Sequence, residues 1–181
     1  MRYIEKNNPC HLFINYLAET KLLEYIKSFL AGNEETHPWK KFDENKEGSE
    51  VKKKLTLHLY NEQKGLCVYC QQELNRNNKI LSNYAHLEHL RPKEIYPGLS
   101  LDYLNLTVSC NGFDCMQFST KKEFCGHKKG NEFDDDKFLN PAEIKDIEKY
   151  FVYTPNGNIK PASDLSDVEK EKAEYMINLL C

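Results

Sequence analysis

The sequence predicts an α+β fold in which a cysteine-rich centre is flanked by helices. Apolar residues recur near a helical period in the first third of the chain and again close to its end. Between these regions the composition changes to Cys, His, Asn and Gly, and the cysteines stand in spaced sets that suit a tetrahedral metal. We therefore expect an N-terminal helical extension (residues 1–63), a core (64–135) and a C-terminal helix and hairpin extension (136–181), together forming one compact unit.

The N-terminal extension is predicted to contain two helices. The first covers residues 11–31 and ends at a glycine. The stretch 32–49 is polar and contains proline and glycine, so we expect a loop there. A second helix is predicted over residues 50–64, where apolar side chains recur every fourth position, and Gly65 ends it just before the first cysteine of the core.

The core and the C-terminal extension are expected to hold short elements. Strands are predicted near residues 66–68 and 84–87, and the acidic run 131–140 is interpreted as a solvated loop. A short helix is expected after Pro141. The remaining signals predict a hairpin that pairs residues 151–153 with the segment around Ile159, and a final helix opened by a Ser166–Glu169 capping box.

Charge and cysteine content limit the possible settings of the protein. The formal net charge is -3, so any nucleic-acid partner must be attracted by a local basic patch. The opening residues have no apolar core of a secretory signal, and no apolar run approaches the roughly 18 residues of a membrane span. We expect a cytoplasmic protein with no membrane partner. Thiols stay reduced in that compartment, so seven cysteines indicate metal binding before disulfides.

A structural zinc is the first predicted site. Cys67 and Cys70 form a Cys-x-x-Cys pair, which can hold one ion from a tight turn but could also be a redox pair. A second cysteine pair in the same chain favours zinc. We assign Cys110 and Cys125 to it, with Cys115 as the alternative fourth ligand. Simple burial of these thiols is the remaining alternative.

A hydrolytic site is the second prediction. Glu88 and His89 are adjacent, and a neutral imidazole is the usual base near pH 7 while a carboxylate and a second imidazole can hold a divalent ion. On a strand the two side chains would point to opposite faces, so a bend near Pro92 would be needed for both to serve one site. His86 shares the face of Glu88 and is a further candidate for the metal shell. Alone, the pair could be surface residues, but the bracketing cysteines argue against that.

These motifs resemble the HNH endonucleases of the ββα-metal type, and within them the HNH proteins of retron and Septu anti-phage systems, the PtuB type. The resemblance is specific over residues 64–131 and looser outside them. It rests on the opening Met-Arg-x-Ile, the Cys-x-Tyr-Cys knuckle, Glu-His-x-x-Pro-Lys-x-x-Tyr-Pro-x-Leu over residues 88–99, Asn-Leu-x-x-x-Cys over residues 105–110, and Cys-Gly-His-x-Lys-Gly over residues 125–130.

The resemblance implies a ββα-metal core and a role for each site residue. His89 would be the general base, and Asn105 would brace the loop and orient it. Glu88 and His127 would bind the catalytic metal, Mg²⁺ or Mn²⁺. The sequence departs from the pattern where Gly126, in place of a ligand, follows the final cysteine of the zinc set.

The resemblance also implies substrate and partners. Basic residues near the motif suit phosphates of nucleic acid, with DNA favoured. An ABC/SMC-like ATPase of the PtuA type is the expected partner, with a retron reverse transcriptase and its msDNA as further candidates. The alternatives are an RNase that attacks tRNA and a non-catalytic zinc-ribbon interaction module. The candidate nucleic-acid contacts are Arg91, Lys93, Lys128 and Lys129, with Lys121 and Lys122 nearby.

Apolar stripes on the first and last helices are the expected docking surface for the ATPase. Phe13, Tyr25, Tyr175 and Leu180 are the residues expected to remain available to it. The alternative is that both helices only complete the core of this chain.

Overall fold

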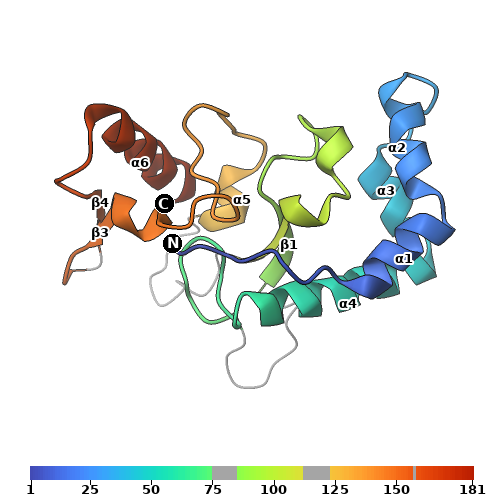
Figure 1. Cartoon of the computed structure of the whole chain (residues 1–181), viewed down its shortest axis with the longest axis horizontal. Coiled ribbons are helices and arrows are strands. Elements are labelled where there is room, and N and C mark those ends of the chain that lie inside the picture. Colours follow the sequence, from blue (N-terminus) through green and yellow to red (C-terminus); the bar gives the residue numbers. More distant parts are fainter. Residues whose placement is uncertain (75–84, 112–122, 157) are drawn as a thin grey trace.

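The computed structural model describes residues 1–74, 85–111, 123–156 and 158–181. Figure 1 shows α1 to α3 gathered at one end, a small sheet and α5 in the middle, and α6 with a second hairpin at the other end. The mixture of helices with small sheets confirms the predicted α+β class. The helices are α1 (His11–Glu19), α2 (Leu22–Leu30), α3 (Pro38–Asp43), α4 (Lys46–Glu62), α5 (Cys125–Lys129) and α6 (Asp167–Leu180). The strands are β1 (Ala85–His89), β2 (Leu106–Cys110), β3 (Phe151–Tyr153) and β4 (Ile159–Pro161), and short 3-10 turns cover Pro97–Leu99, Tyr103–Asn105 and Ile147–Tyr150.

The single helix predicted over residues 11–31 is wrong, because the chain breaks between α1 and α2. Thr20 directs both its backbone N–H and its hydroxyl to the carbonyl of Tyr16, at 3.0 and 2.6 Å. Lys21 then adopts a left-handed conformation with φ 55°, which no α-helix continues. The bend lets each helix bury its own apolar face, Phe13 and Leu17 on α1 and Leu22 on α2.

The loop predicted over residues 32–49 is also wrong in part, because it contains α3 and the first turn of α4. Pro38 occupies the first turn of α3, where its missing N–H costs nothing, and the His37 side chain accepts from the N–H of Trp39. Asn45 caps α4 by accepting from the N–H of Gly48 at 2.8 Å. A Cβ at Gly48 would lie 1.8 Å from the carbonyl oxygen of Phe42, so only glycine permits this close packing of α3 on α4.

The central sheet pairs β1 with β2 in antiparallel register, with Glu88 opposite Thr107 and His89 opposite Leu106. The strand predicted over residues 84–87 is confirmed for its described part and runs on to His89. The one predicted over residues 66–68 is reduced to a bridge between Leu66 and Glu73. On the free edge of β2, the buried side chain of Gln63 exchanges two hydrogen bonds with Val108, at 2.7 and 2.8 Å.

The C-terminal extension follows the predictions closely. The hairpin of β3 and β4 is present, although residue 157 of its turn lies outside the described residues. The capping box is confirmed: the hydroxyl of Ser166 accepts from the N–H of Glu169 while the Glu169 carboxylate accepts from the N–H of Ser166. The helix expected after Pro141 is instead a turn followed by the 3-10 turn at Ile147–Tyr150. Across the described ranges of the chain, the helices are too short or too polar to cross a bilayer.

Candidate functional site

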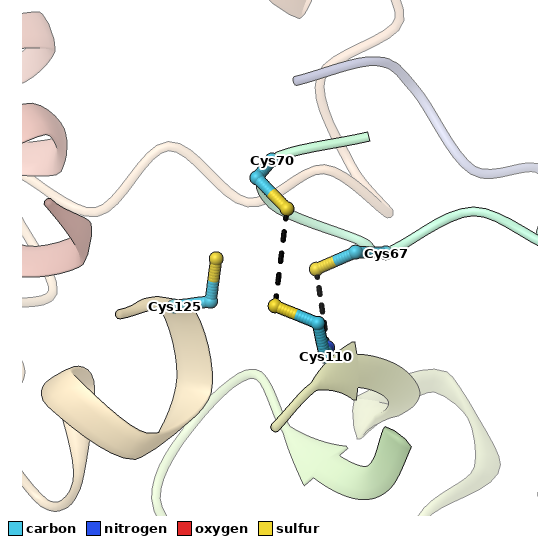
Figure 2. Close-up of side chains that lie close together, drawn as sticks. All are labelled: Cys67, Cys70, Cys110 and Cys125. Carbon is cyan, nitrogen blue, oxygen red and sulfur yellow. Dashed lines mark hydrogen bonds between the residues drawn. The ribbon is translucent and has the colours of Figure 1, made fainter. Parts of the chain in front are cut away.

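Four thiols from three separate elements meet at one point. Cys67 and Cys70 lie in the turn after α4, Cys110 ends β2, and Cys125 begins α5 (Figure 2). Their sulfur atoms all lie within 4.8 Å of one another. A tetrahedral ion with metal–sulfur bonds of about 2.3 Å separates its ligands by about 3.8 Å, and Cys70 Sγ lies 3.8 Å from Cys110 Sγ. The cluster can hold one metal ion and is consistent with a structural zinc.

The local backbone is shaped to present these sulfurs. The N–H of Cys110 donates to Cys67 Sγ at 3.3 Å, and Cys67 itself donates its N–H to the carbonyl of Gln72. Gln71 closes the knuckle in a left-handed conformation, with φ 62°. Such features follow from tertiary packing, so the Cys-x-x-Cys spacing alone could not reveal them.

The electrostatics of the cluster favour a cation. Burial raises the pKa of Cys67, but hydrogen bonds from Cys110, Cys125 and Cys70 outweigh it, and the net pKa lies well below that of a free thiol. The pKa values of Cys70 and Cys125 are raised, first by their contacts with Cys110. One thiolate therefore forms readily, and further ionisation requires a positive ion among the sulfurs. The assembled four are the predicted set, while Cys115 lies outside the described residues.

Glu88 is a buried, ionised carboxylate bonded to Tyr69, which stands between Cys67 and Cys70. Its Oε1 accepts from the hydroxyl of Tyr69 and from Lys129 Nζ, both at 2.9 Å, and its Oε2 lies 3.4 Å from His86 Nε2. Burial raises the pKa of Glu88, but His86 and Lys129 outweigh that effect and lower the net pKa. Oε2 thus remains the oxygen directed at the imidazole of His86.

His89 is held as a neutral imidazole. Its Nε2 lies 2.9 Å from the carbonyl oxygen of Ser100, which can only accept, so Nε2 carries the proton and Nδ1 carries the lone pair. Burial lowers the pKa of His89 to about 4. The ring of Trp39 meets it edge-on, with centroids 4.6 Å apart. His89 is therefore a proton acceptor at neutral pH.

Asn105 fixes the loop that holds His89. Its side-chain amide donates to the carbonyls of Arg91 and Leu99 at 3.0 and 3.1 Å, and its carbonyl accepts from the N–H of Arg91 at 2.7 Å. These bonds tie both ends of the loop from residue 91 to residue 99 together. Ser100, the partner of His89, follows directly.

One pocket of about 350 Å³ brings Glu88 and His89 together at the end of β1. Its wall also includes His86, Gly126 and Lys129. Trp39 and Lys52, from α3 and α4, also line it. The sequence analysis missed these last two residues, because their approach depends on how the N-terminal helices pack and carries no local motif.

The predicted basic residues lie in different environments. Arg91 pairs with Glu143 at 2.9 Å and with Asp135 at 3.5 Å. Lys93 pairs with Glu94 and lines the pocket. Lys128 donates to backbone carbonyls at the end of α6. Lys129, the fourth predicted nucleic-acid contact, is directed into the protein. Its side chain is 1% exposed and is bonded to Glu88 and to the carbonyl of His89. Lys121 and Lys122 lie outside the described residues.

His127 lies on the exposed side of α5. Its ring centroid is 4.4 Å from that of His86, and the two planes are tilted by 50°. Burial and then the neighbouring His86 lower the pKa of His127. His86 lines the pocket beside Glu88, and His127 packs against His86. Both imidazoles are candidates for the metal shell in the sequence analysis.

Comparison with known proteins gives two relatives, while no family model matches the chain. The first is named as a candidate HNH endonuclease of retron Vc95 from Vibrio cholerae serotype O1 biovar El Tor, 29% identical over 133 residues, which are 72% of this chain and 58% of the relative. The second is named Septu protein PtuB, from Bacillus thuringiensis, 29% identical over 129 residues, which are 71% of this chain and 40% of the relative. The chain thus spans about half the length of the relatives it matches. They confirm its resemblance to HNH nucleases of the retron and Septu type.

Proposed function

We propose that this relative of the retron and Septu HNH nucleases is a metal-dependent phosphodiesterase with a ββα-metal core made of β1, β2 and α5. The observation that carries the proposal is the shared pocket at the end of β1. There an ionised carboxylate, Glu88, adjoins a neutral imidazole, His89, whose proton-accepting nitrogen is fixed by Ser100. A zinc on the four cysteines would hold the core together.

The chemistry follows from the fixed tautomer of His89. Its Nδ1 takes the proton from the attacking water, and the carbonyl of Ser100 keeps the ring in place while the imidazolium forms. Asn105 acts through the loop that carries Ser100, as a positioning residue. Glu88 and His127 are the proposed ligands of Mg²⁺ or Mn²⁺, which, when bound, offsets the charge that develops on the phosphate.

Nucleic acid is the proposed substrate class, with DNA favoured. Arg91, Lys93 and Lys128 lie around the motif, and Lys52 adds a further cation to the pocket wall. Because the net charge is -3, binding must depend on this local cluster, and its affinity should fall steeply with salt. An RNase that acts on tRNA would use the same groups.

The name of the Septu relative supports a place in anti-phage defence with an ATPase partner of the PtuA type. A retron reverse transcriptase with its msDNA is the further candidate partner. Two of the predicted docking residues are not available, because Phe13 is 0% and Leu180 is 6% exposed within the core of the chain. Leu23 and Leu30 of α2 are 52% and 57% exposed and replace them in our proposal for the docking face.

The test is a cleavage assay with plasmid DNA, linear DNA and tRNA in Mg²⁺ or Mn²⁺, with and without the partner ATPase. The parent should cut DNA, and His89→Ala should lower the rate by a factor on the order of 10²–10⁴. Zinc content and the melting temperature of the variant should match those of the parent. If the parent cuts tRNA but not DNA, the substrate is RNA. A parent that cuts neither substrate in any combination would leave the zinc-ribbon interaction module as the function.

A further inference from the structure

Gly126 directly faces the carboxylate of Glu88. A Cβ built on Gly126 would lie 2.6 Å from Glu88 Oε2 and 2.7 Å from His86 Nε2. Gly126 does not have a positive φ, so its backbone conformation does not itself require glycine. The missing side chain therefore matters because of the space that it leaves in front of these two atoms.

His86 directs its Nε2 toward that space. It precedes Glu88 by two positions on β1, so both side chains lie on one face of the sheet. His86 Nδ1 lies 3.1 Å from Asn111 Oδ1 and Nε2 lies 3.4 Å from Glu88 Oε2, so both ring nitrogens face acceptor oxygens. A divalent ion between Nε2 and Oε2 would take the place of the proton shared by these two atoms. Metal-binding histidines are commonly oriented by a hydrogen bond from the other ring nitrogen.

The separation of the two atoms suits a single divalent ion. Two ligands about 2.1 Å from an octahedral cation, in adjacent positions, lie about 3.0 Å apart. His86 Nε2 and Glu88 Oε2 are 3.4 Å apart, so a movement of a few tenths of an ångström would bring both into range. Lys129 and Tyr69 bind the other oxygen of Glu88 and leave Oε2 for this purpose.

We propose that His86 is a metal ligand of this site, paired with Glu88, and that Gly126 keeps the coordination space open. The inference rests on the proposed function for the role of the ion, but the binding site itself can be tested without nucleic acid. His127 packs on the outer side of the His86 ring and would be the second imidazole of the set. The sequence resemblance assigned only His127 and Glu88.

The experiment is a titration of the full chain, loaded with zinc, with Mn²⁺ alone, followed by electron paramagnetic resonance and calorimetry. His86→Ala and Gly126→Ala should each weaken Mn²⁺ binding on the order of ten-fold or more. Lys54→Ala, at an exposed position of α4, is the control and should bind as the parent does. Zinc content and melting temperature report the folding of each variant.

The outcomes separate this inference from the proposed function. Weaker Mn²⁺ binding by well-folded His86→Ala supports the site even if the parent cuts no nucleic acid. His86 is not a ligand if His86→Ala binds Mn²⁺ within two-fold of the parent while the separate variant Glu88→Gln does not bind it. If His86→Ala proves unstable, Gly126→Ala decides, and unchanged Mn²⁺ affinity there overturns the proposal. A parent that binds no Mn²⁺ overturns it as well.

Discussion

Replacing Lys129 by methionine should expose the electrostatic cost of the buried Glu88. Methionine fills a similar volume but carries no charge. Lys129 and Glu88 are 1% and 8% exposed, and their charged atoms lie 2.9 Å apart. Removing one partner of such a buried pair typically costs about 3–5 kcal/mol, because the other charge remains without compensation. For a chain of this size, the melting temperature should fall on the order of 10 °C.

The assay is urea denaturation at pH 7 of the zinc-loaded protein without added divalent metal. A double variant that also carries Glu88→Gln should regain much of the loss, because it removes the unpaired charge. Lys54→Met, at an exposed position of α4, is the control and should stay within about 0.5 kcal/mol of the parent. A loss below about 1 kcal/mol for Lys129→Met, or no recovery in the double variant, would refute the reasoning.

The pH dependence provides a second check on the same pair. The pKa of Glu88 is lowered in the folded protein, so its contribution to stability is present above the pKa of the unfolded chain and is lost as the pH falls through the folded pKa. The difference between parent and Lys129→Met should therefore shrink in acid, where Glu88 takes up a proton in the variant. A difference that stays constant with pH would indicate lost packing rather than lost charge.

Four further predictions test other parts of the structure. The pKa of His89 is lowered to about 4, so the unfolded chain binds more protons than the folded chain between about pH 6.5 and 4. In denaturation curves, the parent should therefore lose stability as the pH falls through that range, and His89→Gln should lose less. Cys110→Ser should release about one zinc per chain and destabilise the core in metal analysis and melts, whereas Cys181→Ser should retain it. Asn105→Ala should cost about 1–3 kcal/mol in urea denaturation and slow cleavage while zinc is retained. Leu23→Asp should weaken ATPase capture in pull-downs without changing the melt, whereas Phe13→Asp should unfold the chain.

Local signals explain what the sequence could predict. Three predictions depend on neighbouring residues: the Ser166 capping box, the spacing of Cys67 and Cys70, and the apolar run with turn residues that indicates the hairpin of β3 and β4. The prediction that Glu88 and His89 adjoin one site also depends on neighbouring residues, because both lie at the end of β1 and line the same pocket.

Tertiary packing accounts for the misses. The break at Lys21 depends on how α1 and α2 each reach the core, and α3 forms where the composition favours a loop. Lys129 was predicted to contact nucleic acid, whereas its side chain is buried in an ion pair with Glu88. A buried ion pair between residues 41 positions apart has no signature in a single sequence.

The cysteine cluster and the hydrolytic pocket share the same supports. Cys110 ends β2 directly opposite Ala85 at the start of β1, and Cys125 directly precedes Gly126. The N–H of Gly126 donates to the hydroxyl of Ser109 at 3.1 Å, so the cluster and this bond together fix the start of α5 against the sheet. That placement brings Lys129 to Glu88 and sets the space in front of His86. Loss of the structural metal should therefore disturb the hydrolytic site through α5, even though no cysteine takes part in the proposed chemistry.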